Sequence, residues 1–395
     1  MFPTNKIQLY RDVYIGITLL VILSLNSCKK DVTSNTSEEV IAENVILSEY
    51  LNLPNWPFNY EEKKIPTFLE VEQINTHDNT PVTNPITNNG ATLGRVLFYD
   101  NNLSQNNTIS CASCHHQANG FSDTLVLSVG FEGGKTGRHS MGLSNARYRE
   151  NGRFFWDERA ETLEDQVLEP IQDSIEMGMN LNDLELKLQM QPYYPVLFKR
   201  AFGDSMVSAH HISLALAQFV RSMISFNSRF DQGRAAHKLE EPFSNFTPQE
   251  NQGKEIFHSL DKGMCFSCHF TEAMVTENAR NNGLTREPSD IGLEAVTGNW
   301  IDKGKFKAPS LRNIAVRAPY MHNGGYRDLK SVINAYSTGI SWTSTLDAHF
   351  MMPGNQSAIK FNLSEEEKEA LEAFLHTLTD EEFLTNEIYA DPFKK

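Results

Sequence analysis

A five-residue pattern that occurs twice places the strongest constraint on how this chain can fold. C-x-x-C-H is formed by Cys111, Cys114 and His115, and again by Cys265, Cys268 and His269. In c-type haem attachment, the two thiols bond to the porphyrin and the histidine binds iron. A redox dithiol would not require the histidine, and a zinc site usually spaces its cysteine pairs by roughly 15–20 residues. The repeat therefore predicts two covalently bound haems with His115 and His269 as iron ligands.

The N-terminal segment resembles a bacterial export signal. Lys6 and Arg11 precede an apolar run over 14–25, which is too short to span a bilayer comfortably. Leu25-Asn26-Ser27-Cys28 resembles a lipobox, so residues 1–28 are predicted to be a lipoprotein signal peptide with the lipid on Cys28. The alternative is a soluble secreted protein that is cleaved nearby. The lipoprotein and the secreted protein are both expected in the periplasm or cell envelope. A lipoprotein would be attached to the membrane only through its lipid anchor.

Composition limits the classes of partner. The formal net charge is −15, so the chain lacks the basic field that gathers phosphates, and nucleic acid is not an expected partner. Hydrophobic residues make up 40% of the chain, as expected for a globular protein. Residues 29–46 are polar and are predicted to be a flexible tether.

The remaining chain is predicted to be all-α, with two cytochrome c-like haem domains and long loops. Domain boundaries are placed at 47–232, 233–245 and 246–385, the middle range being a linker that contains Pro242. Expected helices include 91–99, then 248–257 after a capping Thr247, and a helix after the capping box at Ser364. A nearly all-round apolar pattern near 212–224 predicts a buried helix.

The two halves share a short repeat besides the cysteine pattern. Gly94, Leu97 and Phe98 precede the first motif with the same spacing as Gly253, Ile256 and Phe257 before the second. A helix, a loop and C-x-x-C-H are thus used twice, which predicts two domains built on one plan.

Several further segments carry a resemblance to a known family. They are Phe154–Ala160, Gln166, Pro170, Glu176–Gly178, Phe306–Asn313 and Ala318–Gly324. Together with the two motifs, they resemble the bacterial di-haem cytochrome c peroxidases, including the relative that matures the cofactor of methylamine dehydrogenase. The resemblance covers most of 89–380. It implies a peroxidatic first haem and an electron-transferring second haem.

The resemblance also implies catalytic roles for three residues. In the family, a glutamine and a glutamate ten residues later lie over the first haem, and Gln166 and Glu176 keep that separation. Glu176 would act as the acid/base on peroxide, and Gln166 would hold peroxide or water. Trp156 matches a tryptophan between the haems. Without the resemblance, both polar residues would be ordinary solvated side chains and Trp156 a core aromatic.

Two positions depart from the cytochrome c peroxidases of the family. The histidine that caps their resting first iron falls on Phe131, which cannot bind iron, so an iron open at rest is expected; His116 and His139 are nearby substitutes. The methionine that closes their second haem falls on Tyr336, as in the cofactor-maturing relative. A phenolate stabilises ferric and higher states and lowers the potential. Met351 or Met352 is the alternative ligand.

The family also carries calcium between its domains. The asparagine that binds this ion falls on His139, although backbone carbonyls near Arg317 and Pro319 remain available. The sequence therefore leaves calcium open. Family members are often homodimers, and nothing in the sequence identifies an interface.

Three functions follow from these observations. The first is an exported peroxidase that reduces hydrogen peroxide with electrons from a small cytochrome, a cupredoxin or a quinol-linked donor. The second is a peroxide-dependent oxidase that modifies a protein or a small organic molecule, as Tyr336 and Phe131 suggest. The third is a di-haem electron carrier without chemistry of its own.

Overall fold

The computed structural model describes residues 32–62, 65–66, 68–69, 71–149, 151–276, 278–286, 288–354 and 356–395. The predicted signal peptide and Cys28 lie outside these residues. The chain divides into two compact units, Met1–Ile46 and Leu47–Lys395. In the part of the chain that is described, no helix has both the length and the hydropathy needed to cross a membrane.

Helix α1, Val32–Tyr50, occupies most of the segment that was predicted to be a flexible tether. The predicted tether at 29–46 is therefore helical from Val32 onward, and its flexibility stays a prediction. The segment contains no glycine or proline, and it includes the strong helix formers Glu38, Glu39 and Ala42. A polar composition indicated exposure to solvent, but it does not oppose helix formation.

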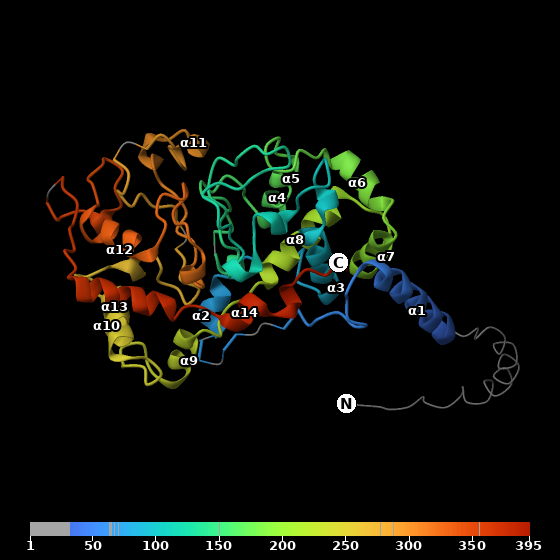
Figure 1. Cartoon of the computed structure of the whole chain (residues 1–395), viewed down its shortest axis with the longest axis horizontal. Coiled ribbons are helices and arrows are strands. Elements are labelled where there is room, and N and C mark those ends of the chain that lie inside the picture. The colour runs from blue at the N-terminus through green and yellow to red at the C-terminus, as the bar shows by residue number, and fades with distance from the viewer. Residues whose placement is uncertain are drawn as a thin grey trace, which may run out of the picture. The chain divides into compact units, whose positions relative to one another are not determined.

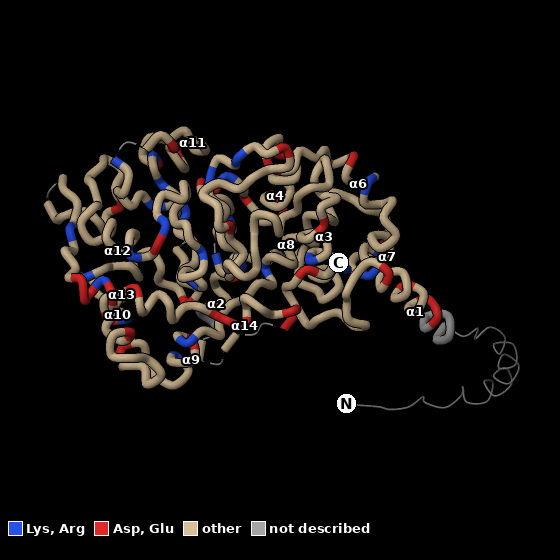
Figure 2. The backbone as a smooth tube through the Cα atoms, in the orientation of Figure 1, with Lys and Arg blue, Asp and Glu red and all other residues tan. Residues whose placement is uncertain are grey.

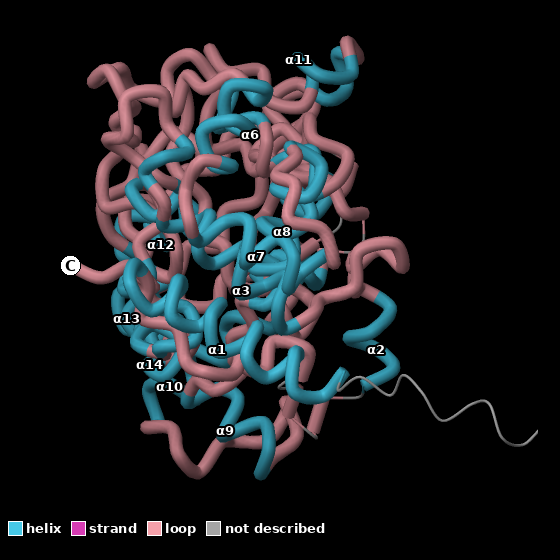
Figure 3. The backbone as a smooth tube through the Cα atoms, turned by 90° about the vertical axis from the view of Figure 1, so that its right-hand side faces the viewer, coloured by secondary structure: helices cyan, strands magenta, loops and turns pink. Residues whose placement is uncertain are grey.

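The second unit is built from helices and long loops, as the sequence predicts. Its helices are α2 (Val71–Thr76), α3 (Asn88–Tyr99), α4 (Leu163–Gln166), α5 (Glu169–Gln172), α6 (Leu181–Gln189), α7 (Tyr193–Phe202), α8 (Ala209–Ser222), α9 (Arg229–Ala236), α10 (Pro248–His258), α11 (Glu294–Thr297), α12 (Leu329–Thr338), α13 (Glu365–His376) and α14 (Glu381–Thr385). Among the described residues, extended pairing is limited to isolated bridges, and Figure 3 shows helices joined by loops. The all-α prediction is confirmed.

The predicted helix starts are confirmed in detail. Thr247 caps α10, and its side chain and that of Glu250 form a reciprocal capping box. Ser364 and Glu367 form the same arrangement at the start of α13. The apolar helix predicted near 212–224 is α8, and it is buried along most of its length.

The repeated glycines mark two equivalent helix crossings. A Cβ atom on Gly94 of α3 would collide with the carbonyl oxygen of Ala215 and approach Phe219 Cβ, both on α8. On α10, a Cβ on Gly253 would likewise collide with Ala370 of α13. Figure 1 shows α3 with α8, and α10 with α13, as separate pairs within the second unit. The short sequence repeat is therefore a repeat of helix packing, because each crossing needs a residue without a side chain.

The chain end returns to the first of these helix pairs. Tyr389 is buried, with its ring centroid 6.3 Å from that of Phe121 and 6.5 Å from that of Phe219. Gln117 Nε2 donates to the Asn386 carbonyl over 2.9 Å. Residues beyond Asp380 thus pack on the half that contains the first motif. The predicted end of the second domain at residue 385 lies inside this returning segment.

The predicted linker at 233–245 is packed against the second half. Helix α9 continues to Ala236, and Phe243 is 1% exposed within the core that also contains Phe257 and Phe374.

Basic and acidic residues are interspersed along the backbone (Figure 2), and some are buried as pairs. Arg312 Nη1, for example, lies 2.8 Å from Asp231 Oδ2.

Candidate active site

The first C-x-x-C-H motif lies on the wall of a cavity of about 730 Å³. Cys111–Ser113 form one turn of 3-10 helix, and the amide of His115 donates to the Cys111 carbonyl over 3.0 Å. This turn brings Cys111, Cys114 and His115 to the same cavity. The two thiols are therefore available to one group in that cavity.

The orientation of His115 fits iron ligation. Its Nδ1 lies 2.8 Å from the Phe121 carbonyl oxygen, so Nδ1 carries the proton and Nε2 keeps its lone pair. An outer hydrogen bond of this kind is typical of metal-binding histidines. Burial lowers the pKa of His115, which keeps the imidazole neutral. These donors fit a covalently attached haem.

Gln166 and Glu176 line the same cavity as the first motif. Gln166 ends the short helix α4, which Thr162 caps by accepting a hydrogen bond from Asp165. Glu176 follows α5 in a turn where its amide donates to Asp173 Oδ1 over 3.0 Å. Two polar side chains from separate turns thus share one cavity with the paired cysteines.

The environment of Glu176 favours proton transfer near neutral pH. Burial, followed by the negative charge of Asp173, raises the pKa of Glu176 from 4.5 to about 7. Arg159 opposes this shift only in part. A carboxyl group with a pKa near the working pH can both accept and return a proton.

The loop at 130–137 carries Phe131 beside this cavity. The Phe131 amide donates to the Glu176 carbonyl over 3.0 Å, and its ring lies against Gly178. Gly130, Thr136 and Gly137 line the cavity, whereas Phe131 does not.

Neither nearby histidine presents a free nitrogen to the first cavity. His116 does not line the first cavity, and its side chain is 42% exposed, with Nε2 3.8 Å from Asp123. His139 is buried, and its ring nitrogens lie 3.0 Å from the Leu125 carbonyl and 3.3 Å from Ser122 Oγ.

Trp156 lies on the boundary between two cavities and lines both. Its indole Nε1 donates to the His139 carbonyl over 2.8 Å. Its ring centroid lies 6.4 Å from that of His322, which stacks on Phe306 at 3.7 Å. The aromatic side chain is thus held between the two haem motifs.

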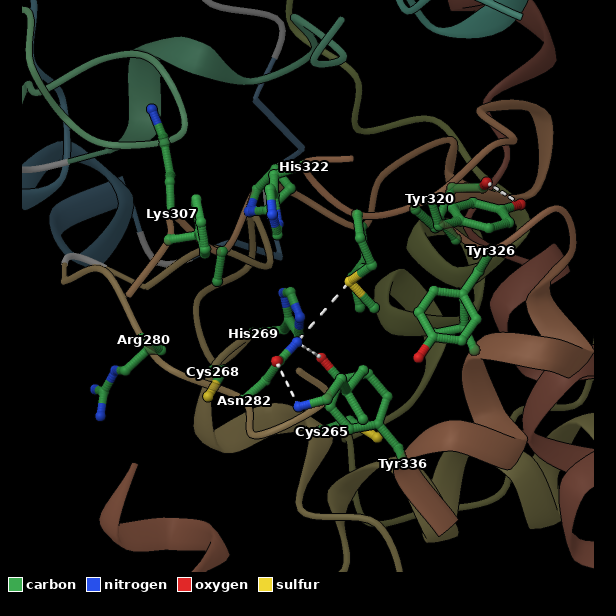
Figure 4. Close-up of a pocket in the computed structure, with 18 of the residues that line it drawn as sticks. Cys265, Cys268, His269, Arg280, Asn282, Lys307, Tyr320, His322, Tyr326 and Tyr336 are labelled. Atoms are coloured by element: carbon green, nitrogen blue, oxygen red, sulfur yellow. Dashed lines mark hydrogen bonds between the residues drawn. The ribbon is translucent and has the colours of Figure 1, made fainter. Parts of the chain in front are cut away.

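The second cavity, of about 250 Å³, contains the second motif. Cys265, Cys268 and His269 line it, and His269 Nδ1 lies 3.1 Å from the Met274 carbonyl. Figure 4 shows His269 and Tyr336 in this pocket, with Asn282 between them. The second site repeats the histidine arrangement of the first.

Tyr336 lines the second cavity, and the methionines proposed as alternatives do not. Asn282 Nδ2 donates to the Tyr336 hydroxyl oxygen over 3.1 Å. Burial raises the pKa of Tyr336 above its usual range. Met351 is packed in the second core, and Met352 is 44% exposed. Of the three side chains considered as the second ligand, Tyr336 is therefore the one that lines the cavity of His269.

Basic groups on the second cavity also fit a haem. Arg317 is buried and lines this cavity, and its Nε atom has no hydrogen-bond partner among the described residues. Arg280 also lines the cavity, but it is partly exposed and its Nη1 is paired with Asp347 over 2.7 Å. A haem brings two carboxylates, and buried guanidinium groups are well suited to carboxylates.

Calcium fits poorly at the position that the sequence pointed to. Both nitrogens of His139 are already engaged, and calcium prefers oxygen ligands. Within the described residues, no three His, Cys, Asp or Glu side chains gather as a metal site.

Sequence reasoning missed the roles of Asn282, Arg280 and Lys307, which line the second cavity. In the sequence, Lys307 is marked only by its place in the segment Phe306–Asn313, which carries the family resemblance. Buried polar residues in loops carry no periodic signal, so only the fold reveals their positions.

Comparisons with known proteins agree with these sites. The profile of the family described as "Di-haem cytochrome c peroxidase" matches residues 88–238. The methylamine utilization protein MauG of Methylophilus methylotrophus is 32% identical over 298 residues, covering 75% of this chain and 84% of the relative. The chain belongs to the di-haem cytochrome c peroxidase family. Membership implies two haems, in accord with the two cavities.

Other relatives span both branches of this family. Cytochrome c551 peroxidase of Nitrosomonas europaea is 32% identical over 248 residues, covering 62% of this chain and 71% of the relative. A solved MauG-like protein associated with microbial copper homeostasis has a TM-score of 0.71 and 30% identity, covering 84% of this chain and 99% of that one. The relatives of this chain thus include both a cytochrome c peroxidase and MauG or MauG-like proteins.

Proposed function

We propose that this di-haem family member reduces hydrogen peroxide to water at a haem held by Cys111, Cys114 and His115, with electrons arriving through a haem held by Cys265, Cys268 and His269. The observation that carries the proposal is the position of Glu176 on the wall of the first cavity, with a pKa of about 7. When bound, the haem supplies a redox-active iron. The reaction consumes one peroxide, two electrons and two protons and yields two water molecules.

Glu176 supplies the proton handling that this reaction needs. As a carboxylate it accepts a proton from one peroxide oxygen, and as a carboxylic acid it returns a proton to the other. The Gln166 side-chain amide has both a donor and an acceptor, so it can hold peroxide or water in the same cavity. Trp156 provides a conjugated ring between the two cavities, which shortens the distance that an electron must travel.

In this proposal Tyr336 would hold the second haem together with His269, and Asn282 donates a hydrogen bond to the Tyr336 hydroxyl oxygen. The absence of Phe131 from the cavity wall, and the engaged nitrogens of His139, support a first iron that is open at rest.

The peroxidase is exported and held by a lipid on Cys28. Its donor is a small cytochrome, a cupredoxin or a quinol-linked protein.

Steady-state turnover tests the proposal. The holoprotein is mixed with hydrogen peroxide and a reduced small cytochrome or cupredoxin, and donor oxidation is followed by absorbance. We expect two donor molecules to be oxidised for each peroxide consumed. Glu176→Gln should lower the rate about 10²- to 10⁴-fold. Donor oxidation that is equally fast in this variant would contradict the proposed chemistry.

A second candidate is an oxidase that uses peroxide to modify a partner protein or a small organic molecule. Tyr336 favours it, because a phenolate ligand would lower the potential of the second haem and disfavour electron uptake from high-potential donors. The identity to MauG relatives agrees with it. Slow donor oxidation, together with peroxide-dependent change in the mass of a supplied protein or aromatic compound, would favour the oxidase.

A further inference from the structure

Lys307 places a buried positive charge on the wall shared by the two cavities. The residue is 8% exposed and lines both cavities. Its Nζ lies 4.6 Å from the ring centroid of Phe154, and Phe154 lines the first cavity and not the second. In Figure 4 the side chain extends away from the second pocket. The ammonium group therefore faces the first cavity.

Lys307 links the segment that follows the second motif to the segment that carries Trp156. Its backbone amide donates to the Trp156 carbonyl over 2.8 Å. Its Nζ donates to the Arg153 carbonyl over 3.1 Å. Both ends of the residue are thus attached to one short stretch of the first half, and this fixes where the charge lies.

The ammonium group lacks an anionic partner among the described residues. An ammonium has three donors, and one carbonyl accepts from Lys307 Nζ. Glu158 attracts the group, but Glu158 is already ion-paired with Arg149, which repels it. Burial, followed by Arg149, lowers the pKa of Lys307 well below its usual range. A buried cation in this position is costly unless an anion accompanies it.

We propose that Lys307 binds a propionate carboxylate of the haem in the first cavity. The proposal rests on the proposed function for the presence of that haem, but it is independent of peroxide chemistry. Haem carries two propionates, so its entry brings the missing anion to the cavity that Nζ faces. Because Lys307 belongs to the second half, binding of this haem would depend on contact between the halves.

A second buried lysine provides a matched control. Lys254 is 2% exposed, and its Nζ lies 4.2 Å from the ring centroid of Phe243. Its Nζ donates to the carbonyls of Leu239 and Glu241, and it lines neither haem cavity. Lys254 therefore shares the burial and the ring contact of Lys307 without access to a haem.

The test compares Lys307→Met, Lys307→Gln, Lys307→Arg and Lys254→Met in the di-haem holoprotein. The midpoint potential of each haem is measured by spectroelectrochemistry, and the propionate-bending bands are measured by resonance Raman. Loss of a cation beside a propionate should lower the potential of the first haem and shift its propionate band. We expect both effects in Lys307→Met and Lys307→Gln, near wild-type values in Lys307→Arg, and neither effect in Lys254→Met.

Two results would overturn the proposal. One is an unchanged potential and propionate band for the first haem in both neutral variants of Lys307. The other is an equal shift in Lys254→Met, which would show a general effect of losing a buried lysine. If the proposed peroxidase reaction fails while the Lys307 shifts occur, the haem contact stands and only the catalytic assignment falls.

Discussion

The side-chain amide of Asn282 donates a hydrogen bond to the hydroxyl oxygen of Tyr336 across 3.1 Å, inside the cavity of the second C-x-x-C-H motif. The contact fixes the end of the side chain that we assign opposite His269. It also gives a phenolate at this position a donor that partly neutralises its charge. In this account, ligation of the second haem by Tyr336 therefore depends on Asn282 as well as on Tyr336 itself.

Replacing Tyr336 tests this ligand. Tyr336→Met exchanges an anionic oxygen donor for a neutral thioether, so the midpoint potential of the second haem should rise. Redox titration followed by absorbance measures the change. Met352→Leu is the control, because Met352 is 44% exposed and does not line the cavity. A ligand change in Met352→Leu, with none in Tyr336→Met, would reject the assignment.

Glu176 should impose a pH dependence on the reaction with peroxide. Its pKa is about 7, and the form that accepts a proton is the carboxylate, whose fraction increases as pH rises. The second-order rate constant for peroxide should therefore increase through pH 7 and level off roughly one to two units above it. Stopped-flow absorbance of the resting protein measures this constant. Glu176→Gln should be slow and almost independent of pH over the same range.

The open first site predicts reactivity without prior reduction. Phe131 does not line the first cavity, and both nitrogens of His139 are engaged. Protein purified in the fully oxidised state should therefore respond to one equivalent of peroxide as fast as protein that was first reduced by one electron. Rapid mixing of both forms makes the comparison. A response restricted to the pre-reduced form would show that a ligand caps the oxidised iron.

The two glycine crossings predict matched losses of stability. Gly94→Ala and Gly253→Ala each place a methyl group against a backbone carbonyl of the facing helix. Each change should lower the free energy of unfolding by about 1–3 kcal/mol, as overpacked cores do. Denaturant unfolding of the holoprotein compares both variants with the wild type, and equal stabilities would argue against close helix contact.

The sequence predicted those parts of the fold that local patterns encode. The caps at Thr247 and Ser364 lie next to the helices they start, so α10 and α13 were found close to their true bounds. The return of Tyr389 to Phe121 was not predicted, because that contact joins residues far apart in the chain. The helix α1 was not predicted, because a polar composition alone does not distinguish a helix from an irregular segment.

In the candidate site, too, some residues could be identified from a local sequence pattern and others could not. Cys111, Cys114 and His115 were identified from spacing, because attachment chemistry fixes their separation. Gln166 and Glu176 required the family resemblance, since carboxylates and amides are common in that stretch. Lys307 has its significance only where two cavities meet, and no feature of the linear sequence marks a buried cation.

Low-temperature electron paramagnetic resonance of the oxidised di-haem holoprotein tests the central claim most directly, because it counts irons with and without a sixth protein ligand. The account predicts one high-spin ferric signal from the first site and one low-spin ferric signal from the second, in equal amounts. Two low-spin signals with no high-spin component would contradict an open site beside Glu176 and leave only electron transfer.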